Sequence, residues 1–290
     1  KKTKSGLFIK KIQKRGTLIF SPYTGFSYAV HPHFSHDIIR WLNLDSKKFL
    51  SNVFEESLGA GWVYPLDNIK PHNSFLLPDK AEWKDGVLPE SVIGINWFIT
   101  GKCNLDCLYC YATDLMRNNI QEPDKEIIIS TAKNILKYKP LFVVITGGEP
   151  LCSPFIETAF KELKGKAGVI VDTNGLNITK KFIKLCKEYN VVVRVSIDSE
   201  RPSIQHFQRP FFKERSNQNS LYKIVENINN CLNESLPIIV QSVITKNNAN
   251  ELVELGNKLY RLGIHFWRIL RIQETAKNSL GYKKLMYDLK

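Results

Sequence analysis

The chain has 290 residues, of which 43% are hydrophobic and 24% are charged, as is ordinary for a globular protein with a sizeable core. No apolar run approaches the roughly 18 residues of a membrane span, and the N-terminal stretch Lys1–Lys4 starts no hydrophobic signal core. The net charge of +13 fits a nucleic acid, an acidic peptide or an anionic small molecule as partner. Because the lysines are spread along the chain, without a block of about five basic residues, we expect a generally basic surface rather than a nucleic-acid groove.

Residues 1–63 are predicted to form a small α+β domain. Alternating apolar residues indicate three short strands, and the turn Ser21–Gly25, which contains Pro and Gly, joins the last two as a hairpin. Two amphipathic helices should follow, with Ser35 and Ser46 as their N-caps. This order of strands and helices is winged-helix-like. Residues 64–91 contain four prolines and are interpreted as a linker.

Histidines and most cysteines do not predict a metal site. Three histidines stand within residues 31–36, but a metal site needs a complete convergent ligand set, so we interpret this stretch as a turn that leads into a helix cap. The six cysteines lack a paired framework spacing, which predicts a reducing, cytoplasmic location. Cys186 and Cys231 fall on apolar helix faces and should pack in the core, and Cys152 is assigned to the core as well.

From residue 92 to 275 the pattern becomes a regular alternation of strands and helices. Six β-branched runs, each apolar on both faces, are the expected strands: Ile93–Thr100, Phe142–Thr146, Val169–Thr173, Val191–Ile197, Ile238–Thr245 and His265–Leu270. The fold class is therefore α/β, with a parallel sheet covered by helices. Six units fall short of the eight that close a TIM barrel, so we expect a partial (β/α)6 barrel. Residues 276–290 should form a C-terminal helix, with a truncated extension as a second interpretation.

Three closely spaced cysteines, Cys103, Cys107 and Cys110, follow the first strand. Ligands of parallel β/α folds lie beyond the carboxyl ends of the strands, which is where these thiols stand. Thiolates are the ligands of iron–sulfur clusters, and three of them would leave one iron of a four-iron cluster open. The alternatives are a zinc site, a disulfide with a spare thiol, or three inert buried cysteines. We favour the cluster, because a zinc site usually has four ligands with shorter pair spacing.

Polar and glycine residues follow the next two strands. Gly147 and Gly148 would expose backbone groups for close approach to a ligand, and Glu149 would face a cation such as an ammonium. An ordinary Gly-rich turn is the alternative interpretation. After the third strand, Asn174 lies in a short polar turn.

The fourth strand ends in Ser196 and Asp198, which share one face because strand residues alternate. Two such groups suit the hydroxyls of a ribose, and a helix N-cap at Asp198 is the alternative. Arg209, further along, suits a carboxylate partner, with a solvated loop arginine as the alternative.

The cysteine spacing, with aromatic Tyr109 before the last thiol, and the run Gly147–Pro150 after the next strand resemble the radical S-adenosylmethionine (radical SAM) superfamily. The resemblance covers residues 92–271. It implies a [4Fe–4S] cluster on the three cysteines and S-adenosylmethionine (SAM) chelated to the open iron through its amino and carboxylate groups. It also implies a set of SAM contacts: Tyr109, Gly147, Gly148, Glu149, Asn174, Ser196, Asp198 and Arg209.

The resemblance also implies a reaction. An external electron donor such as flavodoxin or ferredoxin reduces the cluster, SAM is cleaved reductively, and the 5′-deoxyadenosyl radical abstracts hydrogen from a substrate. The run from Val195 to Arg209 resembles peptide- and protein-modifying members, including sulfatase maturases, but the cysteines of their C-terminal auxiliary clusters are missing after Cys231. We therefore expect an oxidoreductase that modifies a ribosomally made peptide or protein, without a membrane partner. The alternatives are modification of RNA, a nucleotide or a small metabolite, and a non-catalytic iron–sulfur protein for electron transfer.

Two further expectations concern the substrate. Residues 1–63 resemble the peptide-recognition element of enzymes that modify ribosomal peptides, which binds a leader peptide by strand addition. A structural cap on the barrel is the alternative. His265, Arg268 and Arg271, near the sixth strand, are the candidates for an acid or base on the substrate side.

Overall fold

The computed structural model describes residues 6–12, 16–22, 25, 27–30, 92–112, 122–212, 220–264 and 266–272. Several expectations lie outside these residues: the histidines within 31–36, the helices capped by Ser35 and Ser46, the linker 64–91, His265 and the helix 276–290.

A small antiparallel sheet stands at the N-terminus. It contains β1 (Phe8–Ile12), β2 (Gly16–Phe20) and β3 (Ser27–Val30), in the order β1-β2-β3. The turn predicted between the last two strands closes where the Gly25 amide donates to the carbonyl of Ser21 at 2.7 Å. Gly25 has a φ of +71°, a conformation that glycine adopts without steric cost. The three predicted strands are therefore confirmed.

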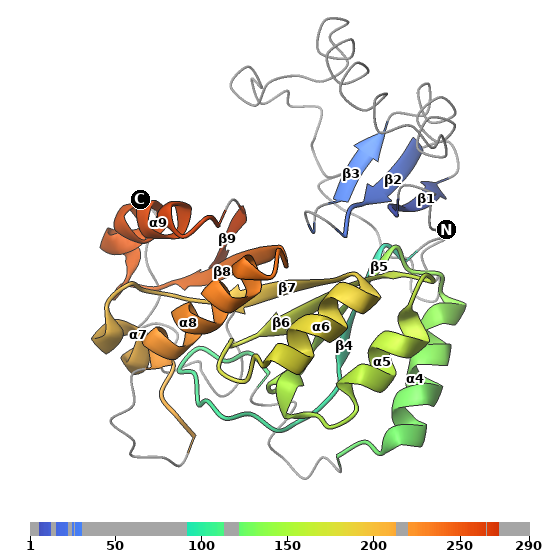
Figure 1. The fold of residues 1–290 in the computed structure, drawn as a ribbon, viewed down its shortest axis with the longest axis horizontal. Coiled ribbons are helices and arrows are strands. Elements are labelled where there is room, and N and C mark those ends of the chain that lie inside the picture. Colours follow the sequence, from blue (N-terminus) through green and yellow to red (C-terminus); the bar gives the residue numbers. More distant parts are fainter. Residues whose placement is uncertain are drawn as a thin grey trace, which may run out of the picture.

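A six-stranded parallel sheet forms the body of the molecule, and its strands follow one another in chain order from β4 to β9. The strands are β4 (Gly94–Phe98), β5 (Phe142–Thr146), β6 (Gly168–Thr173), β7 (Val191–Ser196), β8 (Ile238–Ile244) and β9 (Phe266–Arg271). All six predicted strands are present, and β4 and β9 form the two edges of the sheet (Figure 1). The α/β partial barrel predicted from the sequence is confirmed.

Helices connect these strands and cover the outer face of the sheet (Figure 1). They are α4 (Lys125–Lys137), α5 (Ile156–Leu163), α6 (Lys180–Tyr189), α7 (Pro202–Gln208), α8 (Ser220–Asn233) and α9 (Leu252–Arg261), with short 3₁₀ turns η4 (Pro150–Cys152) and η5 (Ala249–Glu251). Within the described segments, none of the helices is both long and apolar enough to cross a membrane.

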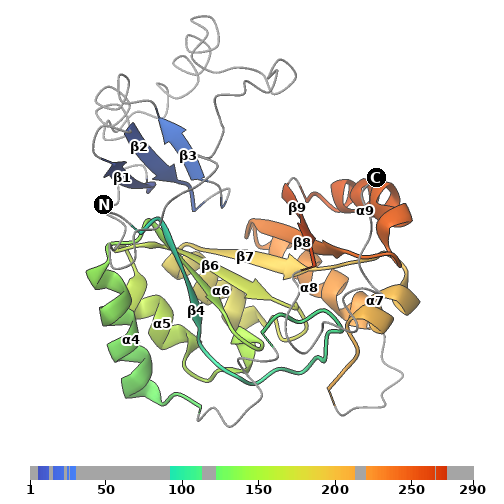
Figure 2. The same cartoon turned by 180° about the vertical axis from the view of Figure 1, so that it is seen from behind.

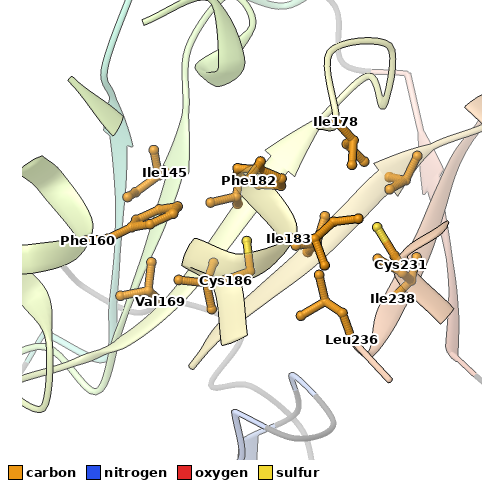
Figure 3. Packing of buried hydrophobic residues seen from close by; sticks show 14 of the residues in the cluster. Ile145, Phe160, Val169, Ile178, Phe182, Ile183, Cys186, Cys231, Leu236 and Ile238 are labelled. Carbon is orange, nitrogen blue, oxygen red and sulfur yellow. The ribbon is translucent and has the colours of Figure 1, made fainter. Parts of the chain in front are cut away.

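The main hydrophobic core lies between these helices and the outward-facing strand residues (Figure 3). Phe160 of α5 and Phe182 of α6 pack there with their ring centroids 6.3 Å apart. Cys186 and Cys231 are fully buried in the same cluster, as predicted. Cys152 differs from the expectation, because it is only partly buried at the end of η4, where the amide of Asn177 lies 3.7 Å from its sulfur.

The N-terminal sheet packs against the end of the barrel at which the strands begin, while the loop after β4 runs along the opposite end (Figure 2). Phe20 is fully buried there, with its ring centroid 5.3 Å from that of Phe142. A Cβ added to Gly168 of β6 would lie 2.2 Å from the Phe20 ring, so this close approach needs a glycine. Inward-facing strand residues such as Val144 and Ile239 complete the cluster. We call this cluster the floor of the barrel.

Candidate functional site

The three cysteines that follow β4 line a single cavity of about 520 Å³. Residues 99–112, here called the cysteine loop, carry Cys103, Cys107 and Cys110, and all three thiols are partly buried. Burial, as the largest cause, and the neighbouring thiols together raise the pKa of Cys103 to about 11 and that of Cys107 to about 12. Thiolates at these positions therefore need a cationic group to stabilise them.

The turn after β5 supports one side of the cysteine loop. The amides of Gly148 and Glu149 donate to the carbonyls of Thr100 and Lys102, at 2.8 and 2.7 Å. A Cβ on Gly148 would lie 2.2 Å from the Lys102 oxygen. The second glycine is therefore required by the packing of two backbones, a reason that the sequence analysis did not identify.

Replacing Gly148 by alanine should lower the free energy of unfolding by about 3 kcal/mol, because backbone atoms must move to admit the methyl group. Gly165→Ala is the matched control, since a Cβ there meets nothing within 4 Å and only its φ of +72° costs about 1 kcal/mol. The shift of the anaerobic melting temperature measures both. Equal shifts for the two variants would contradict this explanation.

The segment after α7 supports the other side of the cysteine loop. The amides of Asp106 and Leu108 donate to the carbonyls of Pro210 and Gln208, at 2.8 and 3.0 Å. This pairing brings Arg209 over the loop, where its guanidinium carbon lies 5.5 Å from the centre of the Tyr109 ring.

Asp198 is fully buried and does not line the cavity. One of its oxygens accepts a hydrogen bond from the Tyr109 hydroxyl and one from Arg209 Nε at 2.7 Å. The other oxygen accepts from the amide of Val243 at 2.8 Å. Arg201, not Asp198, occupies the N-cap position of α7. The geometry thus makes Asp198 a positioning residue for Arg209 and Tyr109, and a direct ribose contact stays a prediction.

Glu149 is almost fully buried at the wall of the cavity. Its carboxylate accepts hydrogen bonds from the Thr173 hydroxyl at 2.6 Å and from the amides of Asn174 and Leu151, at 2.7 and 3.1 Å. Burial raises the pKa of Glu149, and these hydrogen bonds partly offset that rise. Glu149 therefore joins the ends of β5 and β6 next to the cysteine loop.

The remaining predicted contacts also lie at this cavity. The side chain of Asn174 donates to that of Asn104 at 2.6 Å, which connects the end of β6 to the cysteine loop. Ser196 accepts from Gln241 at 3.2 Å. Every predicted cofactor contact except Asp198 lines the cavity: Tyr109, Gly147, Gly148, Glu149, Asn174, Ser196 and Arg209.

A comparison with models of protein families identifies the family of this chain. The family profile described as "Radical SAM superfamily" matches residues 97–259, more than half of the chain. The chain belongs to the radical SAM superfamily. Its cofactors are accordingly a [4Fe–4S] cluster and SAM, as the sequence analysis predicted.

Curated proteins that are similar to this chain have names that point to different substrates. The chain is 26% identical over 196 residues to a protein named "Probable GTP 3',8-cyclase" of Sulfurisphaera tokodaii, which covers 66% of this chain and 60% of the relative. It is 24% identical over 226 residues to "Sporulation killing factor maturation protein SkfB" of Bacillus subtilis, covering 73% of this chain and 53% of the relative. The chain thus spans a little over half the length of these curated relatives.

The fold is similar to that of a solved structure described as Streptococcus suis SuiB bound to precursor peptide SuiA. The TM-score is 0.64 at 13% identity, and the similarity covers 99% of this chain and 66% of that one. This likeness concerns the fold alone.

The residues of this radical SAM chain fit the two cofactors. Three thiols on one cavity match a cluster with an open iron, and the backbone of the Gly147–Gly148 turn and the Glu149 carboxylate lie beside them. No three His, Cys, Asp or Glu side chains in the described part of the chain surround a single metal ion, but a four-iron cluster spaces its ligands more widely than one ion does.

Several residues around the site were missed by the sequence analysis. Thr173 and Asn104 position Glu149 and Asn174, and Glu122 binds the start of the cysteine loop through the Thr100 hydroxyl at 2.6 Å. A more visible group is charged or polar and stands inside apolar strands: Asn96, Asp172, Arg194 and Gln241, all of which line the cavity. A charged or polar residue within an otherwise apolar strand, as in Val191–Ser196, is the sequence signal that could have identified them. Arg268 and Arg271, which the sequence analysis named, line the cavity too.

Proposed function

We propose that this radical SAM enzyme modifies a peptide or protein, using the cysteine loop and the barrel interior as one reaction chamber. The observation that carries the proposal is the joint arrangement of thiols and strand-end residues on a cavity that continues into the barrel as far as Phe142. A reduced [4Fe–4S] cluster would supply the electron that cleaves SAM into methionine and a 5′-deoxyadenosyl radical. The chain's own task is to hold SAM and substrate together and to exclude water.

Cys103, Cys107 and Cys110 would hold the cluster. The backbone at Gly147 and Gly148, with Glu149, would bind the methionine amino group, and Arg209 would bind a carboxylate. Ser196, Asn174 and Tyr109 would contact the rest of SAM. Asp198 would act through Arg209 and Tyr109, since its two oxygens already have three donors.

The choice of a peptide substrate is supported by the N-terminal sheet. The likeness to SuiB extends over 99% of the chain, whereas that to another solved radical SAM structure, "Native anSMEcpe with bound AdoMet", covers 63%. The outer edge of β3 carries no partner strand among the described residues, so strand addition by a leader peptide is part of the proposal. An external donor such as flavodoxin or ferredoxin would reduce the cluster. The six free cysteines support a cytoplasmic location.

A nucleotide is the second candidate substrate, because relatives named GTP 3',8-cyclase match 66% and 62% of this chain at 26% identity. Arginine side chains in the cavity would suit phosphates as well as carboxylates.

The test is anaerobic formation of 5′-deoxyadenosine by the reconstituted enzyme with reductant and SAM. Short precursor peptides encoded beside the gene, GTP and buffer alone are compared. We expect a peptide, but not GTP, to raise 5′-deoxyadenosine formation and to gain a mass change. Glu149→Gln should lower that formation at least tenfold while the iron content stays at the wild-type value, because a cation contact is weakened and the cysteine ligands remain. Stimulation by GTP alone would sink the peptide proposal.

A further inference from the structure

The interior of the barrel carries a layer of polar side chains between the floor and the cysteine loop. Asp172 of β6 and Arg194 of β7 are neighbours in register, and so are Gln241 of β8 and Arg268 of β9. All four line the same cavity as the three thiols. Side chains in this layer therefore lie on the path from the cofactor site toward the floor.

Two of these charges neutralise each other. Arg194 Nε and Nη2 donate to the two oxygens of Asp172 at 2.5 and 2.7 Å, a bidentate pair. The side chains of Arg194 and Asp172 are only 12% and 20% exposed. Asp172 is therefore committed to Arg194 and is not available as a full counter-ion for another group.

Arg268 is the remaining charge of the layer. Its guanidinium has neither a salt bridge nor a hydrogen bond to any residue that the structure describes. The side chain is exposed where it lines the cavity, and its charge is repelled by Arg194 and attracted by Asp172. The other arginines at the cavity differ, since Arg209 is paired with Asp198 and Arg271, which also lines the cavity, is the last residue of β9, beyond the layer. Two arginines of the layer, Arg194 and Arg268, thus face one carboxylate, Asp172, so the layer carries a net positive charge.

We propose that Arg268 binds a carboxylate of the substrate inside the barrel, with the Asp172–Arg194 pair holding the neighbouring wall in place. This inference rests on the proposed function, because it assigns the carboxylate to a peptide. A single carboxylate balances one unpaired guanidinium, whereas a triphosphate would bring several negative charges next to Asp172. The apolar side chains of Val144 and Phe142 below the layer suit the aliphatic part of an aspartate, glutamate or C-terminal residue.

The test measures binding, independently of turnover. Anaerobic calorimetry of the cluster-loaded enzyme with SAM and no reductant compares acetyl-Ala-Ala-Glu-Ala-Ala-amide with the same peptide carrying Gln in place of Glu. We expect the Glu peptide to bind the wild type about tenfold more tightly, the contribution of one charge-assisted hydrogen bond. Arg268→Gln should remove this preference, and Arg268→Lys should keep part of it. Arg261→Gln on α9, an exposed arginine outside the cavity, is the matched control and should keep all of it.

Calorimetry with SAM and no peptide compares the affinity of Arg268→Gln and of the wild type for the cofactor. A loss there would make Arg268 a SAM contact and overturn the inference. Equal affinity for the two peptides, no measurable binding of either, or a preference that survives Arg268→Gln would overturn it as well. If GTP alone loses affinity in Arg268→Gln, the bound anion is a phosphate and the carboxylate is wrong. If the proposed function is wrong but the inference on Arg268 is right, the enzyme still prefers the Glu peptide but turns over no peptide. The two failures can therefore be distinguished.

Discussion

Alanine at Cys103, Cys107 or Cys110 is expected to reduce the iron content of the anaerobically reconstituted enzyme from about four atoms per chain to a small remaining fraction. The three thiols line one cavity, and each lost ligand opens a second iron to solvent. SAM-dependent 5′-deoxyadenosine formation should fall below detection in all three variants. Iron and sulfide analysis, with the visible absorbance of the cluster, measures the outcome.

Cys152→Ala is the matched control for these variants. Cys152 lies close enough to Cys103 to raise its pKa, yet it does not line the cavity. The control should retain the cluster and the activity of the wild type. A Cys152→Ala variant without iron, or a Cys107→Ala variant with a full cluster, would contradict the assignment of the ligands.

Asp198→Asn should destabilise the enzyme by about 4 kcal/mol, because it leaves the guanidinium of Arg209 buried without its counter-charge. The two side chains are 0% and 9% exposed, so solvent cannot replace the lost partner. The melting temperature should fall by roughly 10 °C. Iron retention should fall too, since Asp198 also binds Tyr109 of the cysteine loop.

The same substitution at Asp124 is the control, because the N-cap of α4 is exposed and asparagine caps a helix as well as aspartate does. Its melting temperature should stay within about 1 °C of the wild type. The double variant Asp198→Asn with Arg209→Gln should recover part of the loss, since it removes the unpaired charge. A double variant less stable than Asp198→Asn would show that the pair is not the cause.

The sequence predicted the barrel well because each strand and helix is indicated by a pattern within a short stretch of the chain. Runs such as Phe142–Thr146 are β-branched and apolar on both faces, and the helices between them have a clear period. The cysteine spacing and the Gly147–Pro150 turn are local signals too, and both segments contribute to the cavity at which we expect the cofactors.

Contacts between distant segments could not be predicted in this way. The role of Gly148 depends on Lys102, and that of Asp198 depends on Tyr109 and Val243, far away in the chain. Nothing in the local pattern indicates that Asp198 turns away from the cavity while Ser196, two residues earlier, faces it.

The packing of Phe20 onto Phe142 has a consequence for the shape of an acceptable substrate. Among the described residues, the small sheet blocks the far end of the chamber, so an extended polypeptide cannot thread through the barrel along its axis. A peptide substrate, as proposed above, would have to insert a chain terminus or a tight bend toward Arg268 and leave by the route it entered. A cyclic product, or one bridged close to an end, is compatible with that geometry.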